Sequence, residues 1–110
     1  MTTAHLTVEE QRTATDAVLR LVGEIDMATA GDLRAAATKT IRNPPDRVVL
    51  DFAGVTFCDS QGLSTLISLN RDITAAGGTL VLSNVGDFMG RLLEITGLRA
   101  AFTVEDNSPA

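Results

Sequence analysis

Hydrophobic residues along the chain fall into short segments whose spacing predicts strands. Weak alternation over residues 5–11 and a stronger apolar run over 17–22 predict two strands joined by a polar turn, an antiparallel hairpin that stops at Gly23. The runs 48–52 and 79–82 are apolar on both faces, which is typical of buried strands in a parallel sheet. Residues 101–104 predict a last edge strand.

Three other segments carry apolar residues at helical spacing. The first follows Thr29, which with Asp32 resembles a capping box, and the prolines after Asn43 end it. The second covers residues 60–76 and ends at Gly77, because glycine adopts a left-handed conformation without steric cost. Its predicted inward stripe is Leu63, Leu66, Ile67, Asn70 and Ile73, while Phe88, Leu92 and Ile95 mark the third helix, which ends at Gly97.

The order of these elements predicts an α/β fold. A hairpin followed by alternating strands and helices gives a mixed sheet of four to five strands. Its later strands run parallel through right-handed crossovers, and the three helices gather largely on one face. The length of 110 residues fits a single domain, with an ordered core expected over about residues 5–104.

Composition narrows the function classes. The 14 acidic and 9 basic residues give a net charge of −5, which argues against a nucleic-acid partner. A single cysteine allows no internal disulfide, so a reducing compartment is expected. The first residues show no signal-peptide pattern, and no apolar run approaches the roughly 18 residues of a membrane span. We therefore expect a cytoplasmic protein without a membrane partner.

Ser60 lies where the 48–52 strand, through a tight connection, leads into the second helix. Serine at such a join is commonly an N-cap, and neighbouring Asp59 is also a cap-forming residue. Functional sites also concentrate at the carboxyl ends of parallel strands, and Gly62 removes side-chain bulk on the approach. A phosphate on Ser60 would add about −1.5 to −2 charges. The helix amides would stabilise that charge in part, and Asp59 would oppose it.

Catalysis by Ser60 has little support. A nucleophile elbow needs Gly-x-Ser-x-Gly, whereas Cys58-Asp-Ser-Gln-Gly62 lacks the first glycine. The only histidine is His5, and nothing in the sequence places it near Ser60. We therefore do not expect an enzyme.

The sequence gives equally little support for a metal or cofactor site. One histidine and one cysteine cannot form an ordinary zinc site, although Asp26 and Asp59 could bind magnesium if they met in space. Lys39 is the only lysine, and no phosphate-binding Gly-rich loop precedes it. No cofactor or metal is expected. Cys58 is either an oxidant sensor or, more commonly, a small buried hydrophobic residue.

Three blocks carry a family resemblance: residues 23–30, beginning Gly-Glu-Ile-Asp; residues 48–63, which contain Phe-Cys-Asp-Ser-Gln-Gly-Leu; and residues 77–82 with 92–98. Together they resemble the STAS-domain anti-sigma factor antagonists. The resemblance covers about residues 5–104 and implies a STAS-like fold. It also implies a switch rather than an enzyme. The unphosphorylated antagonist binds an anti-sigma factor that is also a serine kinase, and thereby releases a sigma factor.

Carried over by position, the phosphoacceptor is Ser60, and Asp26 and Asp59 match acids that flank it. With Gln61 and Gly62, these residues are the expected partner contacts. Phosphorylation by the kinase would end binding, and a phosphatase would restore it. Gln61 departs from the family, where a second Ser or Thr is common, which leaves open a STAS domain that serves a transporter or a ligand-sensing relay without phosphorylation.

Overall fold

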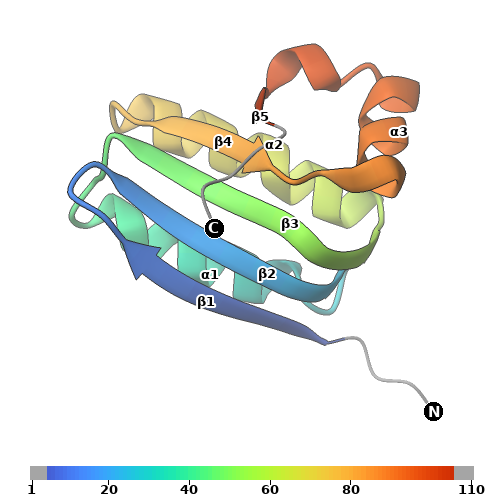
Figure 1. Cartoon of the computed structure of the whole chain (residues 1–110), viewed down its shortest axis with the longest axis horizontal. Coiled ribbons are helices and arrows are strands. Elements are labelled where there is room, and N and C mark those ends of the chain that lie inside the picture. The colour runs from blue at the N-terminus through green and yellow to red at the C-terminus, as the bar shows by residue number, and fades with distance from the viewer. Residues whose placement is uncertain (1–4, 106–110) are drawn as a thin grey trace.

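A mixed sheet, whose strands lie in chain order, organises the protein in a computed structural model that describes residues 5–105 (Figure 1). The strands are β1 (Leu6–Arg12), β2 (Asp16–Ile25), β3 (Arg47–Cys58), β4 (Thr79–Ser83) and β5 (Thr103–Glu105). The helices are α1 (Ala30–Ile41), α2 (Ser60–Ala75) and α3 (Gly86–Thr96), with a short 3-10 helix, η1 (Arg99–Ala101), before β5. Strand β1 pairs antiparallel with β2, and every later pair is parallel. The predicted mixed sheet is confirmed.

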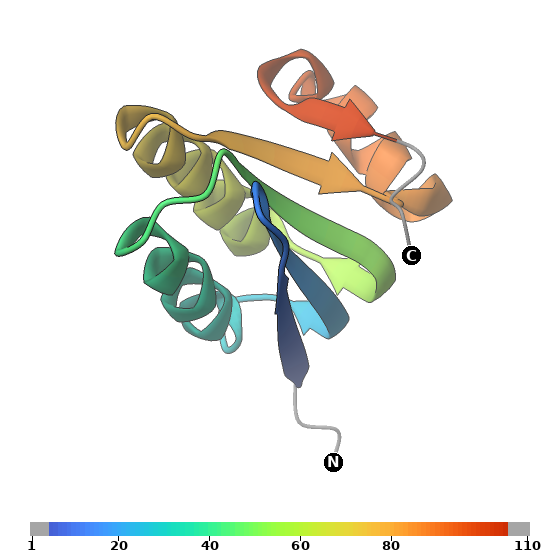
Figure 2. The ribbon, with the colours of Figure 1, turned by 60° about the vertical axis from the view of Figure 1, so that its left-hand side comes forward.

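Helices α1 and α2 lie side by side on one face of the sheet (Figures 1 and 2). Their buried leucines pack against the inward residues of β2, β3 and β4. Both helices lie on the same face because the crossovers between these parallel strands have the same handedness. Helix α3 follows β4, and its Met89 and Leu93 join this same core. The expectation that helices gather largely on one face is therefore confirmed.

Strand β3 is longer than its apolar run predicts. It continues past residue 52 to Cys58, so the predicted tight connection before Ser60 is wrong. Strand β2 likewise continues past Gly23, and the two extensions pair as far as Ile25 and Cys58, with register shifts on the way. Gly23 permits this irregularity because its φ is +123° and any Cβ would lie 2.1 Å from the carbonyl oxygen of His5.

The inward stripe of α2 is partly as predicted. Leu63, Leu66 and Ile73 are buried, but Ile67 is 37% exposed and Leu69 occupies the core instead. Asn70 is half-buried and donates a hydrogen bond to the carbonyl oxygen of Ala101, which ties α2 to η1. The predicted ends of α2 and α3 at glycines are confirmed, since Gly77 and Gly97 both have positive φ.

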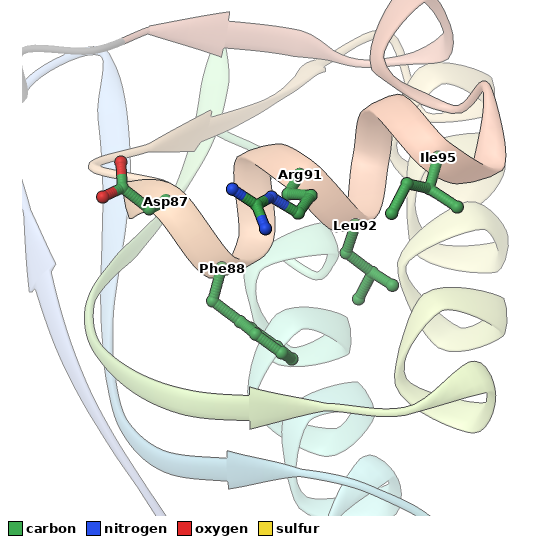
Figure 3. Close-up of a pocket in the computed structure, with 5 residues that line it drawn as sticks. All are labelled: Asp87, Phe88, Arg91, Leu92 and Ile95. Carbon is green, nitrogen blue, oxygen red and sulfur yellow. The ribbon is translucent and has the colours of Figure 1, made fainter.

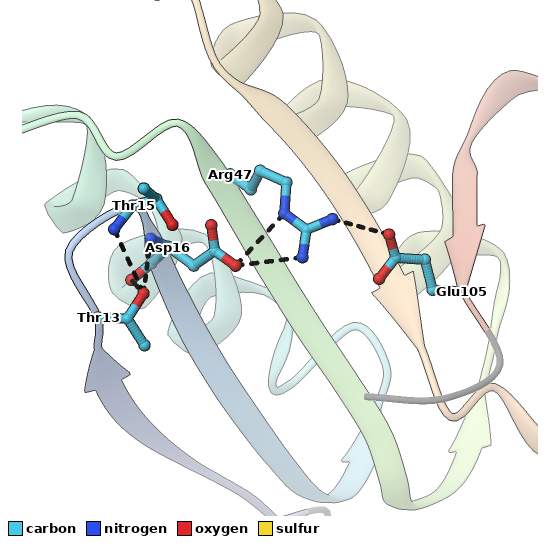
Figure 4. A network of polar contacts seen from close by, with 5 residues as sticks. All are labelled: Thr13, Thr15, Asp16, Arg47 and Glu105. Carbon is cyan, nitrogen blue, oxygen red and sulfur yellow. Dashed lines mark hydrogen bonds and ion pairs between the residues drawn. The ribbon is translucent and has the colours of Figure 1, made fainter. Parts of the chain in front are cut away.

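An ion-pair network crosses the sheet face that carries neither α1 nor α2 (Figure 4). The guanidinium of Arg47 on β3 contacts Asp16 on β2 at 3.1 Å and Glu105 on β5 at 2.7 Å. Asp16 is further held because its backbone N–H donates to Thr13 Oγ1. The hydrogen bond from Arg47 holds the pKa of Asp16 below its ordinary value, and Asp16 in turn raises the pKa of Arg47.

No helix within the described residues combines the length and apolar character that crossing a bilayer requires.

Candidate functional site at the carboxyl ends of β2 and β3

The carboxyl ends of β2 and β3 bring the two candidate acids to one edge of the sheet. Ile25 and Cys58 are the last paired residues of these parallel strands, and Asp26 and Asp59 follow them directly. The backbone N–H of Asp59 donates to the carbonyl oxygen of Ile25 at 3.1 Å, which extends the pairing into the loop. Asp26 and Asp59 therefore flank the same surface.

Asp59 is the N-cap of α2. Its extended backbone ends β3, and its Oδ1 accepts a hydrogen bond from the N–H of Gly62 at 2.9 Å. Ser60 is therefore the first helical residue, and the interpretation of Ser60 itself as the cap is wrong. Ser60 is exposed, and its hydroxyl takes part in none of the side-chain hydrogen bonds found within residues 5–105.

Gly62 is buried directly beneath Ser60's turn. A Cβ at this position would lie 2.7 Å from Cys58 Sγ and 2.9 Å from both Cγ2 and the carbonyl oxygen of Ile25. The glycine thus allows the start of α2 to pack closely against the ends of β2 and β3. Neighbouring Gln61 is exposed, and its side chain takes part in none of the hydrogen bonds found within residues 5–105, so the Asp59 cap stays intact beside it.

Asp26 shapes the turn between β2 and α1. Its Oδ1 accepts hydrogen bonds from the N–H groups of Ala28 and Thr29 at 2.9 and 3.1 Å. The buried Thr29 hydroxyl accepts from the N–H of Asp26 and donates to the carbonyl oxygen of Glu24. Thr29 makes no side-chain cap bond at the start of α1, so the predicted capping box with Asp32 is wrong. The threonine instead locks the turn that carries Asp26.

Cys58 is a buried packing residue. Only 3% of it is exposed, and burial raises the pKa of its thiol to about 12, with the nearby charge of Asp59 adding to the effect. Because the thiolate is the reactive form, a thiol with so high a pKa reacts slowly with oxidants near neutral pH. The geometry favours the buried hydrophobic role over the oxidant sensor.

The surroundings of Ser60 contain little else that could perform chemistry. His5 precedes β1, so β2 lies between it and β3, and its ring contacts Thr7. Within residues 5–105, no group of three or more histidine, cysteine, aspartate and glutamate side chains is arranged to hold a metal ion. What the site offers is an exposed hydroxyl at a helix start, next to Asp59 and at the same sheet edge as Asp26.

Exposed apolar side chains adjoin this surface, and the sequence patterns did not assign them to it. Met27, in the turn after Asp26, is 75% exposed, and Phe57, near the end of β3, is 41% exposed. The Phe57 ring stacks on Phe88 of α3 with centroids 6.2 Å apart. The sequence could have pointed to Phe57 as an aromatic residue on the solvent side of a strand. That inference requires knowing that β3 extends to Cys58.

Comparison with known proteins agrees with this arrangement. Residues 8–104 match the family described as "Mlab, STAS domain". The chain is 30% identical to the anti-sigma F factor antagonist of Paenibacillus polymyxa, over 82% of this chain and 78% of that protein. It also resembles the crystal structure of an anti-sigma factor antagonist from Mycobacterium paratuberculosis, with a TM-score of 0.80, 27% identity, and coverage of 94% of this chain and 87% of the other.

A further solved structure shares the fold. The Bacillus cell fate determinant SpoIIAA, described in its phosphorylated form, matches with a TM-score of 0.69 at 23% identity, over 94% of this chain and 93% of that one. Sequence match, identity to a curated relative and fold all agree. The chain belongs to the STAS-domain family of anti-sigma factor antagonists.

Proposed function

We propose that this protein is a phosphorylation-controlled antagonist of an anti-sigma factor in the cytoplasm. In its unphosphorylated form it binds an anti-sigma factor that is also a serine kinase, and a sigma factor is released. The kinase transfers the γ-phosphoryl group of ATP to the Ser60 hydroxyl, the hydroxyl loses its proton, and ADP leaves. The phosphorylated protein dissociates, and a phosphatase restores it by hydrolysis. The protein is the substrate of this chemistry and not its catalyst.

The exposed, unbonded hydroxyl of Ser60 carries this proposal. Because Asp59 caps α2, the helix start does not depend on Ser60, and a kinase can modify the hydroxyl without breaking a structural bond. The amide groups of the first turn lie beside it and partly stabilise a phosphate. The fold should therefore survive phosphorylation, as a reversible switch requires.

Charge supplies the mechanism of release. Asp26 and Asp59 already make this surface acidic, and no ion pair within residues 5–105 involves either carboxylate. A phosphate adds about −1.5 to −2 charges at the same place. A partner surface fitted to the unphosphorylated site then meets an unpaired, desolvated charge, which is costly at an interface. We assign the partner contacts to Asp26, Asp59, Ser60, Gln61 and Gly62.

The names of the relatives support antagonism of an anti-sigma factor over a transporter subunit or a ligand-sensing relay. The curated relative from Paenibacillus polymyxa is named for antagonism of an anti-sigma factor. SpoIIAA, which shares the fold, is described in a phosphorylated form.

Intact-mass measurement after incubation with a candidate kinase and ATP tests the proposal. We expect one added phosphate in the wild type and in Ser64→Ala, which removes an exposed serine one turn further along α2. We expect none in Ser60→Ala. A phosphate on Ser60→Ala, or no phosphate on the wild type with any kinase that binds it, would contradict the proposal.

A further inference from the structure

Helix α3 has two apolar stripes, and the described chain fully buries residues of only one of them. Met89 and Leu93 face the core and are buried. Phe88 and Ile95 lie on the other side and are 48% and 75% exposed, with half-buried Leu92 between them. A helix with two apolar sides buries both only if it has two partners. The described chain covers this second stripe only in part: Leu92 packs against the margin of the core and Phe88 contacts Phe57, whereas Ile95 is left exposed.

The second stripe forms a groove of about 300 Å³ lined by Asp87, Phe88, Arg91, Leu92 and Ile95 (Figure 3). Positions 88, 92 and 95 follow the spacing by which one helix offers anchors to a partner. The two charged residues in the lining have opposite signs, so the groove as a whole is neutral and apolar. It therefore suits apolar side chains rather than a charged ligand.

The groove is continuous with the Ser60 surface. Phe88 at one end of the stripe stacks on Phe57, which is three residues before Ser60 and is itself 41% exposed. An apolar path thus runs from Phe57, near the end of β3, across the two rings and along α3 to Ile95. A protein that covers Ser60 from this side meets the ring pair next, and the groove lies directly beyond it.

We propose that the α3 groove is the second half of the contact with the anti-sigma factor, which places apolar side chains between Phe88 and Ile95. This inference rests on the proposed function and extends it. The groove contributes affinity that phosphorylation does not remove, because it carries no net charge and contains none of the Ser60 turn. The Ser60 surface then supplies the switch, and the α3 groove supplies the phosphorylation-independent part of the binding.

Titration calorimetry with the purified anti-sigma factor kinase tests this division. We expect Ile95→Gln, which alters a well-exposed helical side chain, to raise Kd about tenfold. Val22→Thr is the control for a polar change at an exposed apolar position, since Val22 is 48% exposed and lies on β2 rather than on α3. Its Kd should stay within about twofold of the wild type. Combined with Ser60→Asp, Ile95→Gln should lower affinity by the same factor as it does alone.

Each other result would overturn the inference. Equal Kd for Ile95→Gln and wild type, with Ser60→Asp still weakened, would refute the groove contact and leave the proposed function standing. Equal losses in Ile95→Gln and Val22→Thr would show a general effect of surface polarity. A wild-type dimer by light scattering that Ile95→Gln converts to monomer would assign the groove to a second copy of the chain. Absence of wild-type binding would contradict the proposed function as well.

Discussion

Three residues within the first turn of α2 have separate roles. Asp59 caps the helix, Ser60 leaves its hydroxyl free, and Gly62 lets the turn pack against Cys58 and Ile25. This division explains how a site can accept a phosphate while its backbone stays in place. It also makes the glycine as necessary as the serine, although for packing rather than chemistry.

Gly62→Ala should destabilise the fold by about 1–3 kcal/mol, because a new methyl group would overlap Cys58 Sγ and the Ile25 carbonyl oxygen. Gly31→Ala is the control, since a Cβ at that α1 position meets nothing within 4 Å. It should be neutral or stabilising by up to about 1 kcal/mol. Urea denaturation of both variants measures the difference, and similar stability of the two would refute the close-packing role of Gly62.

At the residue scale, the sequence predicted a candidate site at Ser60 but did not show which residue caps α2. Ser60 and Asp59 are both good N-cap residues, so local preference could not decide between them. The choice depends on β3 running to Cys58, which makes Asp59 the last extended residue. That length comes from pairing with β2, a contact between distant segments. The phosphoacceptor assignment of Ser60 remains a prediction.

Helix α2, which carries Ser60 at its start, is packed onto the sheet by its buried side chains. Leu66 is fully buried within the main core, whereas Ile67 beside it is 37% exposed. The helix therefore presents one apolar stripe to the sheet and leaves Ile67 at its margin. This anchors Ser60 at the end of a rigid helix rather than on a mobile loop.

Leu66→Ala should lower the free energy of unfolding by about 2–5 kcal/mol, as expected when a fully buried leucine leaves a cavity. Ile67→Ala should cost less than half as much, because much of that side chain already contacts water. Thermal or urea unfolding compares the two. A larger loss of stability from Ile67→Ala than from Leu66→Ala would contradict this orientation of α2, in which Leu66 faces the sheet.

Helical spacing predicted the existence and ends of the helices better than their faces. Over α3, Phe88, Leu92 and Ile95 form a regular stripe, but Met89 and Leu93 form another, and only the second is buried. Periodicity alone cannot rank two apolar stripes on one short helix. The packing of α3 beside β3 and η1 decides which stripe turns inward.

The whole molecule is a one-sided assembly, with α1 and α2 on one sheet face and an ion-pair network on the other. Arg47 joins three strands across that second face by contacting Asp16 and Glu105 (Figure 4). The parallel pairing of the later strands and the side taken by the crossovers were predicted from the alternation of elements, whereas the order of the strands in the sheet comes from the structure alone. The Arg47 network was not, because its three members are far apart in the sequence and meet only in the sheet.

Asp16→Asn should show a pH-dependent loss of stability. The pKa of Asp16 is lowered in the folded protein, so its contribution is present above the ordinary carboxyl pKa of 3.8 and is lost as pH falls through the folded-state value. The wild type should exceed the variant by less than about 1 kcal/mol at pH 7, since the pair is partly exposed. Urea titrations from pH 7 to pH 2 follow the gap, and a gap that widens toward acid would contradict the ion pair.

The central claim is that a phosphate on Ser60 switches partner binding off. Calorimetric titration of the anti-sigma factor kinase with the unphosphorylated and the phosphorylated protein, each verified by intact mass, tests it most directly. We predict that the phosphorylated form binds at least about tenfold more weakly, because a new charge must be desolvated beside Asp26 and Asp59. Equal Kd values for the two forms would contradict the switch.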